Sequence, residues 1–413
     1  MLFTLLLAAT LQFDFPAIHI GIAEYEEGPT GATVFYFPRP VMVAVDVRGG
    51  SPATINTDTL RLSYDEPYID AVTFAGGSSY GLSVATGVAA EIKDRSANAG
   101  DWTNIPTVTG AIIFDLGPRR YNTIVPDSAL GRAALRNAKP NSFDLGARGA
   151  GRFAMQSGYF GDAGRTYSGQ GAAFRQIGNV KIAVFTVVNS LGTIVDRKGS
   201  IVRCAAAPCG TIAERLESTA GRIKRTAETQ PTENTTLTLV VTNQKLPVWA
   251  LQRLAVQVHT SMARAIQPFH TTRDGDVLFA ATTGEVDNDL SVADLGVIAS
   301  EVAWDAVLSS VPQLDPSSDG AVSKVDELTL DRFVGRYEFA PGVTATVTRD
   351  GAQLHIESSK GSLYLPEKQR VAIDPTSPAE FRVRNDRRAR IVFDENGLTI
   401  NPGHWPLSAK RVE

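Results

Sequence analysis

The stretch PTENTTLTLVVTN, residues 231–243, joins a polar run that contains a proline to a block rich in β-branched residues. Residues 237–241 predict a strand, and Thr235 and Thr236 stand at its start. A threonine hydroxyl is a weak nucleophile near neutral pH and needs a base close by. A free α-amine, with a pKa of about 7.7–8.0, can be that base on the same residue. We therefore hypothesise that the protein cuts its own peptide bond between Asn234 and Thr235, so that Thr235 begins a new chain as its nucleophile.

The same residues have two simpler interpretations. Asn234-Thr235-Thr236 fits the acceptor pattern for N-glycosylation, which also arises often by chance. A loop that enters a strand at two threonines is equally ordinary. The choice therefore depends on the rest of the chain.

Composition limits the class of protein. The chain has 413 residues, of which 43% are hydrophobic and 20% charged, as is typical of a soluble globular protein with two or three domains. The formal net charge is −4 and there is no basic block, so nucleic acid is not an expected partner. No apolar run is long enough to span a membrane. The glycines of 146–151 do not form the fingerprint of a dinucleotide site, and we expect no cofactor.

The N-terminus and the two cysteines bear on the cellular compartment. Residues 2–11 form a short apolar run without the positive charge and cleavage site of a good signal peptide. Residues 1–12 are therefore either a signal or a disordered N-terminus, and export and a cytoplasmic location both stay open. Cys204 and Cys209 are close enough for a local disulfide, which would favour an oxidising compartment. They have no nearby histidine, and we expect no metal site.

Strands and long helices mix along the first three quarters of the chain. Blocks with a period of two or continuous apolar runs predict strands at 15–25, 34–38, 41–47, 69–77, 110–116 and 180–189. Apolar stripes predict helices at 128–138, from Pro247 to about Ile266, and from Ser291 to Val311. The first begins at Asp127 or Ser128, and Ser291 forms a capping box with Asp294 at the start of the last. This mixture predicts an α+β fold, a layered αββα sandwich.

The texture of the sequence changes after residue 311. Residues 312–328 are rich in proline, serine and aspartate and predict a linker. Short strands broken by Asp-Gly, Asn-Gly and Pro-Gly turns follow, so 329–413 predicts a separate small all-β barrel. The first domain accordingly spans 13–311.

Two further features could support catalysis by a nucleophilic Thr235. In Asp274-Gly275-Asp276 the carboxylates are two residues apart, so in a strand they would point to one side and could hold and tune the Thr235 ammonium. An Asp-Gly hairpin turn is the simpler interpretation, and the further ligands of a calcium loop are missing. Asn189 ends a strong strand, where its amide could donate to an oxyanion or simply form a turn.

A rival nucleophile lies earlier in the chain. Residues 77–81, Gly-Ser-Ser-Tyr-Gly, match the G-x-S-x-G elbow of α/β-hydrolases between a predicted strand and a helix. Ser79 would then attack, and His259 or His270 would be the base. Both histidines also fit structural roles, one beside a helix stripe and one before a turn.

Seven motifs in series resemble one known family: EYEEGPTGATV, VDVRGG, AGGSSYGL, PDSALGRAAL, SGQGAAF, NTTLTLVVTN and IQPFHTTRDGDVLFAATTGE. They resemble the nylon-oligomer hydrolases, which belong with the L-aminopeptidase/D-esterases among self-processing N-terminal-nucleophile amidohydrolases. The resemblance covers about 13–311. It implies an αββα fold, self-cleavage into two chains that stay together, a homo-oligomer of cleaved protomers, and small peptides or amide oligomers as substrates.

The resemblance also implies roles for single residues. Thr235 matches the family's nucleophile and Asn234 the residue before the cut. Asn189 matches the asparagine that helps hold the oxyanion or the nucleophile, and Asp274 and Asp276 match the acidic pair. In this interpretation the segment containing Ser79 is structural.

Two positions depart from the family pattern. The family's lysine after the glycine-rich run falls on Tyr159, and its strand tyrosine falls on Phe114. Tyr159 can donate a hydrogen bond but carries no positive charge at neutral pH. A non-catalytic binding homologue therefore stays open as an alternative to the hydrolase. The tail RYEFAPGVTATVTRDGAQLHIE resembles a small β-barrel appended to some secreted serine hydrolases, which the family pattern does not include.

Overall fold

The computed structural model describes most of the chain, and everything below refers to those residues. The described residues are 9–61, 67–96, 100–103, 105–116, 124–160, 164–204, 209–214, 217, 234–287, 289–311, 325–362, 364–384, 386, 389–402 and 405–412. Most of 210–234, for which the sequence predicts part helix and part loop, lies outside them.

A long strand, β3 (Thr30–Val47), joins the two halves of the main sheet. Its end pairs with β16 through 42–47, and its beginning pairs with β2 and β5 through 30–36. The sequence predicts two strands here, at 34–38 and 41–47, and that prediction was wrong because one strand runs through Pro38 and Pro40. The prolines cannot donate to the ladder, so they produce a shift in the β3–β5 register between Tyr36 and Val41 instead of ending the strand.

The sheet order is β11-β12-β14-β16-β3-β5-β6-β4, and β2 pairs with β3. The remaining strands of this sheet are β2 (His19–Tyr25), β4 (Thr54–Ile55), β5 (Tyr68–Ala75), β6 (Val108–Ile112), β7 (Lys139–Pro140), β11 (Gln170–Ile177), β12 (Val180–Asn189), β14 (Thr235–Gln244) and β16 (Val277–Val286). Smaller pairings join β1 (Thr10–Gln12) to β8 (Ser142–Asp144), β9 (Met155–Gln156) to β10 (Thr166–Tyr167), and β13 (Thr193–Ile194) to β15 (Ile266–Gln267).

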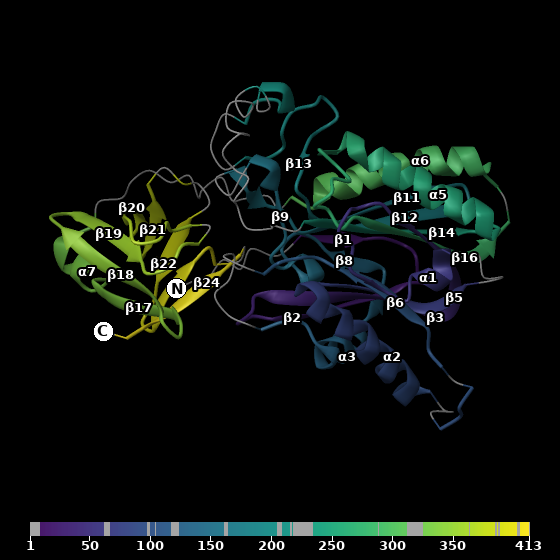
Figure 1. Cartoon of the computed structure of the whole chain (residues 1–413), viewed down its shortest axis with the longest axis horizontal. Coiled ribbons are helices and arrows are strands. Elements are labelled where there is room, and N and C mark those ends of the chain that lie inside the picture. Colours follow the sequence, from purple (N-terminus) through teal and green to yellow (C-terminus); the bar gives the residue numbers. More distant parts are fainter. Residues whose placement is uncertain are drawn as a thin grey trace.

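Helices cover both outer faces of the two sheet halves (Figure 1). On one side lie α5 (Val248–Ser261) and α6 (Val292–Ser309), and on the other lie α2 (Ser83–Arg95) and α3 (Ser128–Arg136). The remaining short helices are α1 (Asp58–Arg61), η1 (Ser78–Leu82), η2 (Gly149–Gly151), η3 (Gly158–Phe160) and η6 (Met262–Arg264). The predicted helix starts are confirmed, because Asp127 caps α3 and Ser291 caps α6 through their side chains.

Alternation along the strands explains the layers. In β14, Leu237, Leu239 and Val241 point into the apolar core between the two sheet halves, whereas Val240 packs towards α5 and α6. The middle core is rich in aromatic rings, among which Phe35 and Phe74 meet at 5.1 Å between centroids. The predicted αββα sandwich is therefore confirmed.

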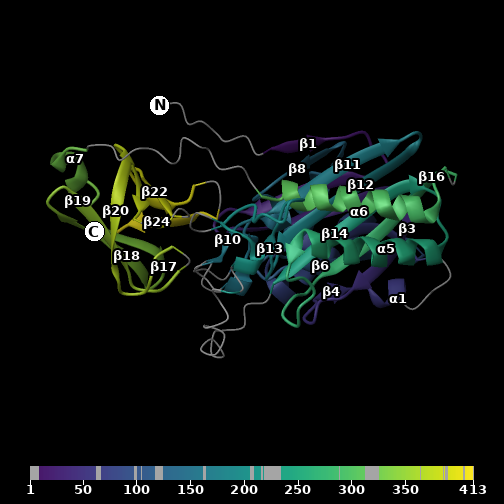
Figure 2. The same cartoon turned by 90° about the horizontal axis from the view of Figure 1, so that it is seen from above.

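The C-terminal part is a closed antiparallel barrel of strands β17 to β24. Its strands are Gly335–Ala340, Val343–Asp350, Gln353–Ser358, Arg370–Ser377, Glu380–Val383, Arg390–Phe393, Gly397–Ile400 and Leu407–Arg411. The short helix α7 (Glu327–Asp331) precedes it and begins inside the segment predicted as a linker. Seen from above, the barrel lies at one end of the sandwich (Figure 2). The predicted small β-barrel is confirmed.

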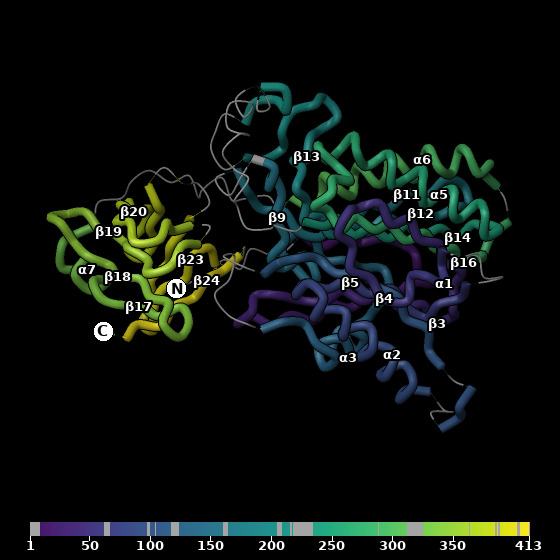
Figure 3. Tube along the Cα trace, viewed as in Figure 1, coloured from purple at the N-terminus to yellow at the C-terminus, as the bar shows by residue number. Residues whose placement is uncertain are grey.

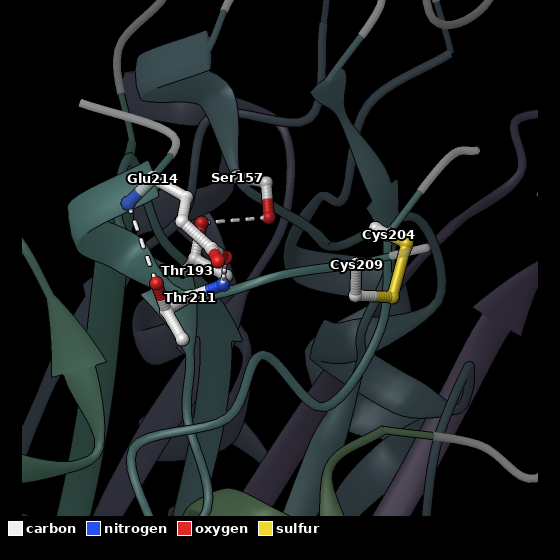
Figure 4. The surroundings of a disulfide bond; sticks show 6 residues. All are labelled: Ser157, Thr193, Cys204, Cys209, Thr211 and Glu214. Atoms are coloured by element: carbon white, nitrogen blue, oxygen red, sulfur yellow. Dashed lines mark hydrogen bonds between the residues drawn. A yellow bond between two sulfur atoms is a disulfide. The ribbon is translucent and has the colours of Figure 1, made fainter. Parts of the chain in front are cut away.

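Two other sequence features can be placed in the structure. Cys204 and Cys209 form a disulfide bond (Figure 4). Among the described residues, no helix is long and apolar enough to cross a membrane. The same residues contain no cluster of three or more histidine, cysteine, aspartate or glutamate side chains arranged to hold a metal ion.

Candidate active site

Thr235 lies at the point where three strands meet. It is the first residue of β14 and stands directly opposite Asn189, the last residue of β12. On the other side, Asn234 forms a parallel bridge with Asp274, which leads into β16. The structure therefore brings together four of the residues that the sequence singles out, and all four are at least 97% buried, since Thr235 is 3% exposed and the others less.

The carbonyl group of Asn234 is held by two donors. The Gly275 N–H donates to Asn234 O at 2.7 Å, and the Thr235 hydroxyl donates to the same oxygen at 2.7 Å. The residue at 275 must be small, because a Cβ built there would lie 2.6 Å from Thr235 Oγ1. Gly275 was visible in sequence only as part of an Asp-Gly turn, and its role as a donor needed the fold.

Asp274 faces the end of β12. Its Oδ2 accepts hydrogen bonds from the Thr271 N–H at 2.9 Å and the Thr271 hydroxyl at 2.6 Å, and its Oδ1 accepts from the Leu191 N–H at 3.3 Å. Burial raises the pKa of Asp274 to about 6, the negative charge of Asp276 adds to the rise, and these hydrogen bonds offset it only in part.

Asp276 has different partners from Asp274. Its Oδ1 accepts from the Thr236 N–H at 2.7 Å, and its Oδ2 accepts from the backbone N–H of His270 at 3.1 Å. The His270 Nδ1 lies 3.0 Å from the same Oδ2. The two carboxylates therefore flank Gly275 just before β16, and Asp276 is fixed by a histidine that the sequence alone could not assign to it.

A second histidine extends this network. The rings of His270 and His259 meet edge to face at 4.3 Å between centroids, and His259 Nδ1 lies 2.9 Å from Asp46 Oδ2. Burial lowers the pKa of His259, so the ring is neutral at neutral pH. These contacts explain both histidines as supports for the acidic side of the site.

Asn189 is oriented through both ends of its side-chain amide. Its Oδ1 accepts from the Met155 N–H at 3.1 Å, and its Nδ2 donates to Phe114 O at 3.0 Å. Because Phe114 takes part through its backbone carbonyl, a phenylalanine in place of the family's tyrosine leaves this contact intact.

The other departure, Tyr159, is accompanied by a buried cation. The Tyr159 N–H donates to Leu191 O at 2.8 Å, which places the residue beside the end of β12. Arg165 is only 2% exposed, and its Nη1 donates to Asn234 Oδ1 at 3.4 Å. A Cβ at Gly158 would lie 3.1 Å from that guanidinium group. A positive charge is thus present next to Asn234 although position 159 does not supply one, and no motif pointed to Arg165.

The structure does not support the rival arrangement around Ser79. Ser79 is exposed in η1, and Asp115 fixes the start of this turn by accepting from the Gly77 N–H at 2.7 Å. Among the described residues no hydrogen bond joins Ser79 to a histidine, and the Nδ1 atoms of His259 and His270 each face a carboxylate instead.

A pH-dependent stability follows from the pKa of Asp274. The pKa of Asp274 is raised from 3.8 to about 6 in the folded protein. The protonated carboxyl therefore contributes to the stability of the fold below about pH 4, and this contribution is lost as the pH rises through about 6. We compare two chains that both carry Thr235→Ala, one of which also carries Asp274→Asn. We expect the free energy of unfolding to increase on the Asp274→Asn change, and this increase should be up to about 3 kcal/mol larger at pH 7 than at pH 4. Urea unfolding at the two pH values measures this difference, and a difference that stays constant would contradict the assignment.

Comparison with solved structures identifies the type of fold. The chain resembles the β-aminopeptidase of a Burkholderia species, with a TM-score of 0.53, 16% identity, and coverage of 74% of this chain and 88% of that one. It also resembles the L-aminopeptidase D-Ala-esterase/amidase of Ochrobactrum anthropi, described as a variant of the Ntn hydrolase fold, with a TM-score of 0.50, 14% identity, and coverage of 73% and 87%. The fold is therefore of the Ntn-hydrolase type.

Sequence comparison then gives the family. The model of peptidase family S58 matches residues 13–325, and the chain belongs to this family. A 6-aminohexanoate-oligomer endohydrolase of Paenarthrobacter ureafaciens is 42% identical over 317 residues, which cover 73% of this chain and 85% of the relative. An uncharacterized aminopeptidase of Mycobacterium tuberculosis is 34% identical over 269 residues, which cover 62% and 74%. The protein is thus a hydrolase of amide or peptide bonds, and the resemblance inferred from its motifs is confirmed.

Proposed function

We propose that the protein cuts itself between Asn234 and Thr235 and then hydrolyses amides with Thr235 as an N-terminal nucleophile. The observation that carries this proposal is the geometry at the bond to be cut. The Thr235 hydroxyl oxygen lies 2.7 Å from Asn234 O, while the Gly275 N–H donates to that same oxygen at 2.7 Å. A nucleophile and an oxyanion donor therefore both meet one carbonyl group.

The self-cleavage begins with attack by Thr235 Oγ on the carbonyl carbon of Asn234. The C–N bond breaks as the new C–O bond is completed, and the hydroxyl proton passes to the departing nitrogen, so an ester and a free amine result. Water then hydrolyses the ester. Asn234 ends the first chain as a carboxylate, and Thr235 begins the second with both hydroxyl and amine.

The mature site repeats this chemistry on a substrate. The Thr235 amine accepts the hydroxyl proton, Oγ attacks the amide carbonyl, and the amine returns the proton to the leaving nitrogen, so an ester on Thr235 and a free amine product result. Water then hydrolyses this ester, which releases the acid product and restores the Thr235 hydroxyl. Asp274 and Asp276 position the amine. Asn189, directly opposite Thr235, supplies a side-chain N–H donor to the same region in both reactions, together with backbone N–H groups.

The names of the relatives support a substrate class. Small peptides and short amide oligomers fit a family whose members are named as aminopeptidases and as a 6-aminohexanoate-oligomer endohydrolase. The two fragments would stay together, because β12 before the cut and β14 after it share a ladder of eight residue pairs. We also propose that cleaved protomers assemble into a homo-oligomer.

Sequencing the N-termini of the purified protein tests the proposal. We expect two ends, and the second should read Thr-Thr-Leu-Thr-Leu, which begins at Thr235. An intact chain that nevertheless hydrolyses amides would contradict the mechanism. An intact chain without hydrolytic activity would instead indicate the non-catalytic homologue.

A further inference from the structure

The peptide group between Ala154 and Met155 is held from two sides. Its N–H, on Met155, donates to Asn189 Oδ1 at 3.1 Å, inside the site. Its carbonyl oxygen, on Ala154, accepts from the indole Nε1 of Trp405 at 2.7 Å. Trp405 comes from the C-terminal barrel, between β23 and β24. One peptide group thus connects the barrel to the asparagine beside Thr235.

Trp405 is built into the contact between barrel and sandwich. It is fully buried, and its ring lies 4.2 Å from Tyr167 and 5.9 Å from Phe153, measured between centroids. On the barrel side, the Tyr364 hydroxyl donates to Trp405 O at 2.9 Å. The backbone of Trp405 has a φ of +45°, which is uncommon for a large side chain and is kept only where the surroundings determine it.

The segment around Ala154 and Met155, which Trp405 contacts, is also hydrogen-bonded to residues just after β12. Met155 pairs with Tyr167 in the β9–β10 ladder. The Ser157 N–H donates to Gly192 O at 2.9 Å, and the Thr193 hydroxyl donates to Ser157 Oγ at 3.0 Å (Figure 4). β9 and β13 lie at the end of the sandwich that is nearest the barrel (Figure 3). The barrel therefore contacts the sandwich at the wall of the site.

Peptide geometry makes this connection effective. The peptide group is planar, so a donor that fixes its carbonyl oxygen also fixes the direction of its N–H. Hydrogen bonds at its two ends polarise one another, which strengthens the bond to Asn189. An N–H pointing at one end of an asparagine amide requires oxygen at that end, and this directs the Asn189 nitrogen towards Phe114 O. Asn189 itself stands opposite Thr235 in the β12–β14 ladder.

We propose that Trp405 is a positioning residue for Asn189, and that the barrel is attached to this hydrolase to hold the Ala154–Met155 peptide group in place. The inference rests on the proposed roles of Thr235 and Asn189. In this proposal the barrel affects the reaction through its contact with the Ala154–Met155 peptide group and not through contact with the substrate.

The test compares rates of self-cleavage in full-length chains after a pulse of cell-free synthesis. Trp405→Phe keeps an aromatic ring and removes the N–H donor, and we expect it to slow cleavage about tenfold. Trp304→Phe is the matched control, because Trp304 Nε1 also donates to a backbone carbonyl, that of Val195 at 3.3 Å, and it should cleave at the wild-type rate. Cleavage of Trp405→Phe at the wild-type rate would overturn the inference.

A double-mutant cycle separates positioning from general loss of stability. If Trp405 acts through Asn189, then Trp405→Phe should not slow self-cleavage any further in a chain that already carries Asn189→Ala. An equal slowing in both backgrounds would show that Trp405 acts elsewhere. If the wild-type chain is cut at Thr235 while Trp405→Phe behaves as wild type, only the coupling fails. If the wild-type chain is not cut there, the proposed function fails and this inference falls with it.

Discussion

Replacing Thr235 with alanine is expected to abolish self-cleavage completely. The substitution removes the hydroxyl that lies 2.7 Å from Asn234 O, and water cannot take its place as an attached nucleophile. On a denaturing gel the variant should give one band at the position of the full 413-residue chain. It should also lack hydrolytic activity, since neither a free amine nor a hydroxyl is present at residue 235.

Two substitutions make this result specific. Thr235→Ser keeps a hydroxyl in the same place and should still cut. Thr236→Ala removes a neighbouring buried hydroxyl for which no hydrogen-bond partner is found among the described residues, and it should cut as the wild type does. If Thr235→Ala still splits between residues 234 and 235, the nucleophile has been assigned wrongly.

Gly275→Ala should have the second largest effect. The new Cβ would lie 2.6 Å from Thr235 Oγ1 and 2.8 Å from Ser51 O, so the hydroxyl or the 274–276 backbone must move. Either movement disturbs the approach to Asn234 or the N–H donor on its carbonyl. Since misplacement by about 1 Å can cost about 100-fold, we expect self-cleavage to slow by about that factor or more.

The control for Gly275→Ala is Gly100→Ala. A Cβ at Gly100 would have no heavy atom within 4 Å, so the same chemical change is made where it meets nothing. Timed samples on a denaturing gel give both rates. Equal rates for the two variants would mean that the close contact between residue 275 and the Thr235 hydroxyl does not matter for cleavage.

Local patterns were enough to predict the elements that carry the site. The apolar run before Asn189 gives β12 with its predicted bounds, and the run after Thr235 gives β14, which continues to Gln244 beyond the predicted end at residue 241. Central strands that are buried on both faces need such continuous apolar side chains. The helix caps at Asp127 and Ser291 follow from side-chain oxygens that satisfy nearby backbone N–H groups. A strand is present where one was predicted at 110–116, but its bounds differ, because β6 spans Val108–Ile112.

Contacts between segments that are far apart in the chain could not be predicted from the sequence. Nothing near Asp276 in the chain indicates that it meets the Thr236 N–H, and nothing near Asn234 indicates Arg165. The link from Trp405 to Ala154 spans 251 positions and joins the C-terminal barrel to the sandwich. Such contacts depend on strand order and docking, which single-chain periodicity does not encode.

Local patterns and the family resemblance suggested Thr235 as nucleophile, Asn189 as oxyanion donor, and Asp274 and Asp276 as the acidic pair, since these residues stand at the ends of strands with strong local patterns. How these side chains are held becomes visible only in the folded molecule. Strand register sets Asn189 opposite Thr235, and close backbone approach makes Gly275 a donor to the bond proposed to be cut. Periodicity in a sequence reports which face of an element is buried, whereas the direction of a hydrogen bond depends on which other element lies against that face.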